Sequence, residues 1–358
     1  MTEALHDHAT PFLVVDQDVL AVNVAEMAAS ARDRDITVRP HAKTHKSPAI
    51  ARLQIDAGAT GLTLATVSEA EVFADEGFTD LFIAYPLWVD IAKGSRLRAL
   101  AERASLTVGV DSVEGARAMA AQCSDVDLRV LVEVDSGHHR SGVQPEQAGD
   151  VAVAAARTGL DVRGVFTFPG HSYSPGVQAD VAAQESEALR TAAASMSAQG
   201  LDAVVVSGGS TPSAAAVEAG SMTEMRPGVY VFGDAQQWEL GSTTPDRIAL
   251  TCLSTVVSHT GGNVVLDAGS KVLGADRPTW ATGSGRLLDH RAARIGLLSE
   301  HHAVVTWPDD LPLPELGSRL RVVPNHVCNA VNLADELVVV RGGTQCDTWP
   351  VAARGANT

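Results

Sequence analysis

The sequence has few cysteines, fewer bases than acids and no long apolar run. Four cysteines in 358 residues, with no Cys-x-x-Cys pair, exclude a disulfide-rich scaffold. No apolar run approaches the roughly 18 residues that a membrane-spanning helix needs. The first residues also lack the lysines and the long apolar core of a signal peptide. We therefore expect a soluble, cytoplasmic protein that binds no membrane.

The charge balance narrows the possible partners. The chain carries 27 lysines and arginines against 43 aspartates and glutamates, a formal net charge of -16. Because no cluster of basic residues in the sequence is large enough to neutralise phosphates, general nucleic-acid binding is disfavoured. Hydrophobic residues make up 45% and charged residues 20%, which is typical of globular proteins. At roughly 150 residues per domain, the length predicts about two domains.

Short apolar runs alternate with alanine-rich segments of helical spacing over the first two thirds of the chain. Helices are predicted at 19–33, 112–122 and 179–199. Near-continuous apolar runs are typical of parallel strands that are buried on both faces. Eight such strands with intervening helices predict a (β/α)8 barrel of the TIM type, and a doubly wound sheet is the alternative. The eight expected strands lie at 36–39, 61–66, 81–85, 106–110, 128–134, 162–168, 203–207 and 228–232.

The pattern changes after about residue 240. Apolar runs continue, but glycine, proline and aspartate now separate them, and few helical stretches remain. This pattern predicts a second, mostly antiparallel β domain. We therefore expect a barrel domain over 10–240 and a β domain over 241–358, the latter including residues 1–9.

A small, flexible loop follows the seventh expected strand. It is formed by Ser207, Gly208, Gly209, Ser210 and Thr211. Backbone N–H groups and hydroxyls of this kind bind phosphate when they precede a helix. Barrels of this class commonly bind phosphate after strands seven and eight. The alternative is an ordinary turn with a helix cap.

Lysine and histidine are crowded after the first expected strand. Lys43 lies in the segment RPHAKTHK with Arg39, His41, His45 and Lys46. Neighbouring cations disfavour a protonated amine, so a lysine here can be nucleophilic near neutral pH. Together with a phosphate loop, this predicts pyridoxal 5'-phosphate held as a Schiff base. The alternative is a solvated basic loop.

Several ordered motifs resemble one enzyme family nearly from end to end. RPHAKTHK resembles the cofactor-lysine motif of the fold-type III pyridoxal phosphate enzymes in the D-threonine aldolase and D-serine dehydratase family. TPFLVVDQDVLAVN is similar to the opening helix of that family, and VEVDSGHHRSGV to the loop that carries an arginine to the cofactor in alanine racemase. SGGSTPS and MRPGVYVFGD resemble its phosphate and ring contacts, and VPNHVCNAVNLADELVVVRGG its C-terminal domain.

The resemblance implies a set of cofactor-binding residues. Lys43 would be the catalytic Schiff-base lysine, in preference to Lys46. Arg140 and Tyr173 would lie near the cofactor ring, Tyr173 as a candidate partner of the pyridine nitrogen. Phe168 stands where relatives often have histidine; it can stack on a ring but cannot transfer a proton. Phosphate and other cofactor contacts would come from Ser207, Gly208, Gly209, Ser210, Thr211, Gly228, Val229 and Tyr230.

His326 and Cys328 are two residues apart in an apolar run. If that run is a strand, both side chains leave the same face. Imidazole and thiolate together suit zinc, whereas the alternative is a buried cysteine beside a satisfied histidine. The resemblance implies a metal at this pair, zinc in the first place, with manganese or magnesium as alternatives. Asp267 either lies near that site or caps a turn.

A cofactor that stabilises a carbanion and a metal that binds a hydroxyl together point to a D-β-hydroxy amino acid as substrate. Its chirality is implied by the resemblance alone. Family aldolases pair the histidine with aspartate, whereas the dehydratases pair it with cysteine, so Cys328 favours dehydration of D-serine to pyruvate and ammonia. D-threonine aldolase and D-threo-3-hydroxyaspartate dehydratase remain alternatives. A cofactor-carrier protein and an alanine racemase fit less well. The resemblance also implies a homodimer.

Overall fold

The computed structural model describes residue 5 and residues 7–358, and these fall into two compact units. One unit comprises 27–43, 54–228 and 356–358, and the other 1–26, 44–53 and 229–355. These ranges divide the chain differently from the expected domains at 10–240 and 241–358. Of the expected N-terminal extension over 1–9, residues 1–4 and 6 lie outside the described residues. No helix in the described part of the chain is long and apolar enough to cross a membrane.

The first unit is a barrel of eight parallel strands in the order β2-β9-β8-β7-β6-β5-β4-β3. A bridge between His41 and Thr63 joins the two outer members, so the sheet closes on itself. This confirms the predicted (β/α)8 barrel and excludes the doubly wound alternative. The strands are β2 (Thr37–Val38), β3 (Leu62–Leu64), β4 (Asp80–Pro86), β5 (Ser105–Val110), β6 (Leu128–Glu133), β7 (Asp161–Phe166), β8 (Val205–Gly208) and β9 (Glu224–Met225).

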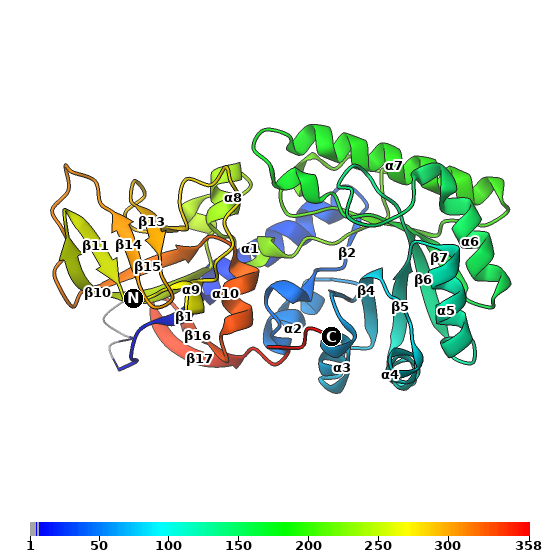
Figure 1. The fold of residues 1–358 in the computed structure, drawn as a ribbon, viewed down its shortest axis with the longest axis horizontal. Helices are drawn as coiled ribbons and strands as arrows, with labels where there is room; N and C mark the ends of the chain where they lie inside the picture. The colour runs from blue at the N-terminus through cyan, green and yellow to red at the C-terminus, as the bar shows by residue number, and fades with distance from the viewer. Residues whose placement is uncertain (1–4, 6) are drawn as a thin grey trace. The chain divides into compact units, whose positions relative to one another are not determined.

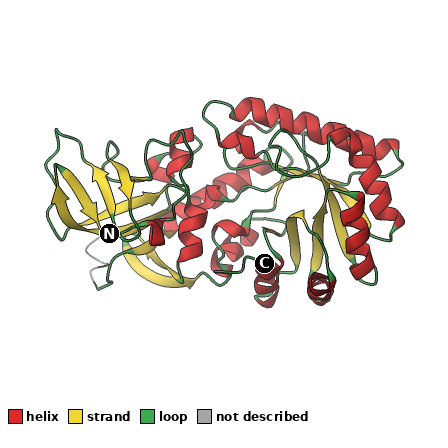
Figure 2. Ribbon diagram, in the orientation of Figure 1, coloured by secondary structure: helices red, strands yellow, loops and turns green. Residues whose placement is uncertain are grey.

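Helices follow the barrel strands and cover their outer side (Figures 1 and 2). Three of them begin at side-chain caps, where Thr66, Asp90 and Ser112 each accept a hydrogen bond from the backbone N–H three residues on. The predictions at 112–122 and 179–199 are confirmed by the fifth and seventh helices. The helices are α2 (Pro48–Asp56), α3 (Val67–Asp75), α4 (Ile91–Ala101), α5 (Val113–Cys123), α6 (Ala148–Arg157) and α7 (Gln178–Ala198).

The predicted eighth strand at 228–232 is wrong. The strand that pairs with β2 and β8 is Glu224–Met225, four residues earlier, and Val229–Val231 is a turn of 3-10 helix. Pro227 cannot donate to a strand ladder, so the apolar run after it does not continue the sheet. The short polar strand before it carries almost no apolar signal.

The second unit is built on a nine-stranded sheet in which β1 and β16 form the parallel pair. The predicted antiparallel β domain is confirmed, and the segment before the helix predicted at 19–33 adds a strand to it. The strands are β1 (Phe12–Asp16), β10 (Leu250–Thr260), β11 (Asn263–Leu266), β12 (Gly285–Leu287), β13 (Arg294–Leu298), β14 (Ala303–Thr306), β15 (Arg319–Pro324), β16 (Glu336–Arg341) and β17 (Thr344–Pro350). The remaining helices are α1 (Gln17–Arg32), which confirms that prediction, α8 (Ala235–Leu240), α9 (Ser270–Leu273) and α10 (Val327–Leu333).

Candidate active site

A cavity of about 590 Å³ opens at the carboxyl ends of the barrel strands. Its volume lies in the range of small-molecule and cofactor sites. The residues that line it come from the carboxyl ends of all eight strands or from the segments that follow them, which is the usual construction of an active site in this fold. They include His41, Lys43, Tyr85, Asp111, Arg140, Ser141, Phe168, Gly209 and Arg226.

Lys43 is the lysine that reaches this cavity. It lies in a 3-10 turn (Ala42–Thr44) after β2, and its Nζ is 5.6 Å from the centre of the Phe168 ring. Lys46 is buried, with a left-handed backbone at φ 50°, and its carbonyl accepts a hydrogen bond from the N–H of Ala353. Of the two lysines, Lys43 lines the cavity and Lys46 does not. The bond of Lys43 to a cofactor stays a prediction.

His41 is a neutral side chain at the wall of the cavity. Burial and then the positive charges of Lys43 and Arg226 hold the pKa of His41 well below its usual value. The Nδ1 atom is buried and has no hydrogen-bond partner among the described residues. A cation two residues before Lys43 would repel a protonated amine, and a neutral imidazole at this position avoids part of that repulsion.

Phe168 forms an aromatic wall that three other side chains approach. The Cζ atom of Arg140 lies 4.9 Å from the centre of its ring, and the ring of His138 meets it edge-on at 5.7 Å. Tyr173 lies in a 3-10 turn (Gly170–Tyr173) with its ring centre 6.5 Å from that of Phe168. Arg140 is half exposed and forms a long ion pair of 4.0 Å with Glu133, so its guanidinium can turn toward a ligand. The expected cofactor contacts of Arg140 and Tyr173 remain predictions.

The glycine-rich loop after β8 is already occupied by internal hydrogen bonds. The Gly209 N–H, at φ 78°, donates to Glu185 Oε1 at 2.7 Å, and the Ser210 N–H donates to Ser213 Oγ at 3.1 Å. A Cβ atom on Gly208 would meet the Glu185 carboxylate at 2.5 Å, so this position requires glycine. The loop leads into a 3-10 turn (Ala214–Ala216) and not into an α-helix. Phosphate binding by Ser207 through Thr211 remains a prediction, and a bound phosphate would share these donors.

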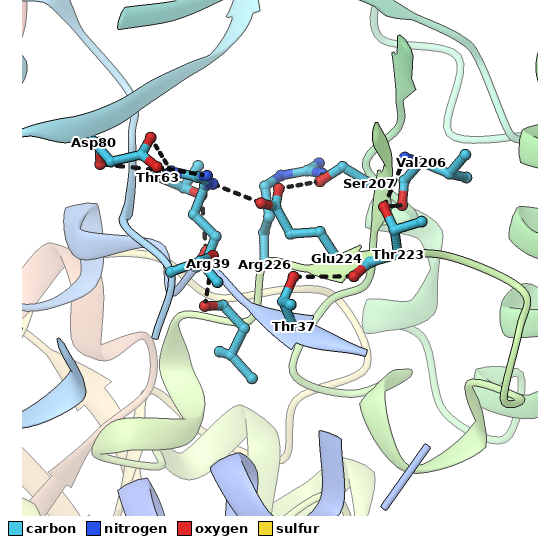
Figure 3. A network of polar contacts seen from close by, with 11 residues as sticks. Thr37, Arg39, Thr63, Asp80, Val206, Ser207, Thr223, Glu224 and Arg226 are labelled. Carbon is cyan, nitrogen blue, oxygen red and sulfur yellow. Dashed lines mark hydrogen bonds and ion pairs between the residues drawn. The ribbon is translucent and has the colours of Figure 1, made fainter. Parts of the chain in front are cut away.

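Ser207 belongs to a buried polar network beneath the cavity (Figure 3). Its hydroxyl donates to Glu224 Oε1 at 2.7 Å and accepts a hydrogen bond from Arg226. Glu224 also accepts from Arg39 Nε at 2.6 Å, and Arg39 donates to Asp80 at 2.8 Å. Burial lowers the pKa of Arg226. At Arg39 burial also acts against the charged form, but the carboxylates of Glu224 and Asp80 outweigh it and raise the pKa of Arg39.

Two further buried acids lie near the cavity. Burial raises the pKa of Glu133 to about 7, although Ser141 and Arg140 stabilise its charged form. Burial likewise raises the pKa of Glu185 to about 7. One oxygen of each carboxyl group has no hydrogen-bond partner among the described residues. Sequence reasoning missed both, because a single glutamate in a strand or a helix carries no signal of burial.

His326 and Cys328 lie at a turn between a strand and a helix, so the condition under which they would share one face of a strand is not met. β15 ends at Pro324, His326 has an extended backbone and caps α10, and Cys328 lies in the first helical turn. Proline ends the ladder, and the Asn325 side chain anchors the turn by donating to Asp276 O at 2.7 Å. The turn nevertheless brings the imidazole and the thiol within hydrogen-bond contact. The Cys328 thiol also lies 3.3 Å from Thr44 Oγ1, and Thr44 follows Lys43 in the chain.

Asp234 faces His326 and was missed by the sequence reasoning. It is fully buried, and its Oδ2 atom lies 3.5 Å from Nδ1 of His326. Burial lowers the pKa of His326, but Cys328 and Asp234 more than offset burial and raise it well above its usual value. Within the described residues, no group of three or more histidine, cysteine, aspartate or glutamate side chains could hold a metal. His326 and Cys328 thus form a two-ligand pair with the donor types that zinc prefers.

Asp267 has a structural role. Asp267 accepts hydrogen bonds from the Thr255 N–H at 2.8 Å and from the hydroxyls of Ser254 and Thr10, both at 2.6 Å. Its carboxylate therefore joins β10 to the segment before β1. His301 and His302 are exposed in the turn between β13 and β14. We assign no catalytic role to these three residues.

Family models match most of the chain. The alanine racemase N-terminal domain matches residues 15–236, and a serine dehydratase domain matches 249–340. D-threo-3-hydroxyaspartate dehydratase of Delftia sp. (strain HT23) is 34% identical over 92% of this chain and 93% of its own length. The chain belongs to the D-threonine aldolase and D-3-hydroxyaspartate dehydratase group of alanine racemase-like enzymes. It is a pyridoxal phosphate-type lyase of this group.

Other members support the same assignment. D-threonine aldolase of Arthrobacter sp. is 34% identical over 97% of this chain and 93% of its own length. The crystal structure of D-threonine aldolase from Filomicrobium marinum superposes with a TM-score of 0.88 at 33% identity, covering 99% of this chain and 98% of that one. Structures of D-threo-3-hydroxyaspartate dehydratase include a histidine-to-alanine variant and, two positions further on, a cysteine-to-alanine variant in the metal-free form. They superpose with TM-scores of 0.90 and 0.89 at 30% identity; the first covers 98% of this chain and 96% of that one, the second 97% and 98%.

Proposed function

We propose that this lyase is a pyridoxal phosphate- and zinc-dependent dehydratase of D-3-hydroxy amino acids, with D-serine as the leading substrate. The observation that carries the choice of dehydration is the pairing of a thiol, Cys328, with the His326 imidazole. A dehydratase relative has been solved as histidine and cysteine variants with the same two-residue spacing, and its cysteine variant is metal-free. A thiol is a softer ligand than a carboxylate and favours zinc over manganese or magnesium.

The residues of the barrel cavity fit pyridoxal phosphate. The volume is sufficient and Lys43 can hold the cofactor. A phosphate at the loop after β8 would share the N–H groups that now donate to Glu185 and Ser213. When bound, the cofactor supplies an electron sink for the pair of electrons released at Cα. A zinc ion held by His326 and Cys328 would supply Lewis-acid stabilisation of the substrate's β-oxygen.

The chain's own residues then have separate tasks. Lys43 removes the proton from Cα of the substrate, while the Cβ–O bond breaks and the oxygen leaves as hydroxide, which becomes water on protonation. Released 2-aminoacrylate tautomerises and takes up water to give pyruvate and ammonia, so atoms balance without an oxidant. Phe168 excludes water from one wall of the cavity, and His41, held neutral by burial, adds no positive charge beside Lys43.

D-threo-3-hydroxyaspartate is a second candidate substrate. Arg140 lines the cavity, is half exposed, and forms a long ion pair of 4.0 Å with Glu133. Such a cation could bind the second carboxylate of a dicarboxylic substrate. The Delftia relative is named for this substrate. Retro-aldol cleavage of D-threonine is the alternative reaction, and the Arthrobacter relative, which is also 34% identical, is named D-threonine aldolase.

Product analysis decides among these reactions. The zinc-loaded holoenzyme is incubated in separate reactions with D-serine, D-threonine and D-threo-3-hydroxyaspartate. The L-enantiomers serve as controls. Dehydration yields pyruvate, 2-oxobutyrate or oxaloacetate with one equivalent of ammonia. Glycine with an aldehyde and no ammonia would refute the dehydratase proposal. Faster turnover of the dicarboxylate than of D-serine, lost selectively in Arg140→Ala, would make hydroxyaspartate the preferred substrate.

A further inference from the structure

A buried carboxylate, that of Asp234, lies beside the Nδ1 atom of His326. Asp234 caps the short helix α8, and its Oδ1 atom accepts the Gln237 N–H at 2.8 Å. Its other oxygen, Oδ2, accepts the Val327 N–H at 3.2 Å and lies 3.5 Å from Nδ1 of His326. Asp234 is 0% exposed, whereas the His326 side chain is 23% exposed. The carboxylate is thus fixed by two backbone N–H groups from different elements.

The second of these contacts is more than a helix cap requires. Capping uses one oxygen that accepts from the N–H two or three residues on, and serine, threonine or asparagine would serve equally. Oδ2 is not needed for the cap. Oδ2 instead accepts the backbone N–H of Val327 and faces the imidazole ring of His326.

The contact decides which ring nitrogen of His326 can bind a metal. Among the described residues Nδ1 is buried and makes no hydrogen bond of normal geometry, and the group that it faces is the Asp234 carboxylate at 3.5 Å. A carboxylate accepts hydrogen bonds and cannot donate them, so its charge favours the His326 proton on Nδ1. In a neutral imidazole the other nitrogen, Nε2, then has a free lone pair. Carboxylates that orient metal-binding histidines in this way typically change metal affinity 10- to 100-fold.

We propose that Asp234 is a positioning residue that holds His326 in the tautomer and ring orientation needed to bind the metal. The inference rests on the proposed metal site at His326 and Cys328. It assigns to the capping residue of α8 a role in the chemistry of a residue 92 positions later in the chain.

Asp234→Asn tests the proposal with little change in volume. Asparagine keeps an oxygen for the Gln237 N–H, but its amide N–H₂ replaces Oδ2 and now donates toward Nδ1. This favours the proton on Nε2, the nitrogen that the metal needs. We expect the zinc affinity of the pyridoxal phosphate-loaded protein, measured by competition with a chromophoric chelator, to fall about 10- to 100-fold.

A second readout reports the tautomer directly. Protein labelled with ¹⁵N-histidine is studied without metal in alkaline buffer, where the imidazole is neutral. The wild type should show the proton of His326 on Nδ1, with the resonance assigned by His326→Gln, and Asp234→Asn should show it on Nε2. If Asp234 had a purely structural role, the proton of His326 would lie on the same ring nitrogen in the wild type and in Asp234→Asn.

Two control variants separate positioning from capping. Asp90 caps α4 through one oxygen to the Lys93 N–H at 2.9 Å, so Asp90→Asn makes the same chemical change at an ordinary cap and should leave zinc affinity unchanged. Asp234→Ser retains a capping hydroxyl and removes the carboxylate, and it should also weaken zinc binding. It serves as the test if the asparagine variant fails to fold, which the circular dichroism and cofactor absorbance would show.

The outcomes distinguish the inference from the proposed function. Wild-type zinc affinity in both Asp234 variants, or a proton that stays on Nδ1 in Asp234→Asn, would overturn the role of Asp234. If His326→Gln binds zinc as tightly as the wild type, the proposed metal site itself is wrong. The tautomer measurement needs no metal and still decides whether Asp234 sets the state of His326.

Discussion

Replacing Glu185 by glutamine should stabilise the protein by an amount that increases with pH. Glu185 lies in α7 and is fully buried, its Oε1 accepts the Gly209 N–H at 2.7 Å, and its Oε2 has no partner among the described residues. Burial raises its pKa from 4.5 to about 7. Glutamine has the same shape and retains an oxygen for Gly209, but it carries no charge that burial could penalise.

The sign and the size of the effect follow from proton linkage. The folded protein holds the proton of Glu185 more tightly than the unfolded chain, so unfolding releases a proton between about pH 4.5 and pH 7. The free energy of unfolding of the wild type therefore falls as pH rises through this window and then levels. At about 1.4 kcal/mol for each pKa unit, the penalty is about 1 kcal/mol at pH 5 and about 3 kcal/mol at pH 7 and above. Glu185→Gln removes it.

Urea unfolding of the cofactor-free proteins at several pH values measures this difference. Glu187 is the matched control, because it lies in the same helix, is exposed and is bonded to Arg190. That hydrogen bond lowers the pKa of Glu187, so Glu187→Gln should give a small change of opposite sign at neutral pH. A stability difference between Glu185→Gln and the wild type that does not change between pH 5 and pH 7 would refute the reasoning.

Three further outcomes are expected. Lys43→Ala should abolish the visible absorbance of bound pyridoxal phosphate, whereas Lys46→Ala should keep it; the reverse result would reassign the lysine. Cys328→Asp should shift metal preference from zinc toward manganese and raise aldolase turnover relative to dehydration, and unchanged metal selectivity in a competition assay would contradict this. Light scattering should show a homodimer, with Trp88 and Ile91, which are 65% and 74% exposed, at its interface. Trp88→Asp should then weaken the dimer, and Leu316→Asp, at a residue 63% exposed, should not.

The parts of the fold with a repeated pattern could be predicted from the sequence. Alternating apolar runs and alanine-rich helices gave the barrel, and the loss of that alternation after residue 240 indicated the second β unit. The eighth strand was misplaced because Glu224 and Met225 have no apolar pattern, while the valine-rich segment after Pro227 does. Periodicity cannot identify a strand of two residues, which is held by its neighbours in the barrel and not by its own preference.

Site residues were predictable where chemistry and spacing are local. Lys43 and the His326–Cys328 pair were found because their motifs lie within a few residues. Glu185, Glu133 and Asp234 were missed because their roles depend on burial and on partners far along the chain. The pairing of Asp234 with His326 has one usable signal. An aspartate at a helix cap is common, but this one is the last residue of MRPGVYVFGD, a segment that the family resemblance had already marked.

The network beneath the cavity shows how such distant partners determine the position of Lys43. β2 and β9 have only two residues each, so few ladder hydrogen bonds hold them in the barrel. Arg39, directly after β2, instead binds Glu224 of β9 and Asp80 of β4, and Glu224 also receives the Ser207 hydroxyl of β8 (Figure 3). The carboxylates of Glu224 and Asp80 compensate the charge of the buried Arg39 guanidinium. These side-chain ion pairs therefore hold β2 in the barrel, where few backbone hydrogen bonds do so. The segment that carries Lys43 begins directly after β2. The direction of that segment therefore depends on Glu224, which lies 185 residues from Arg39.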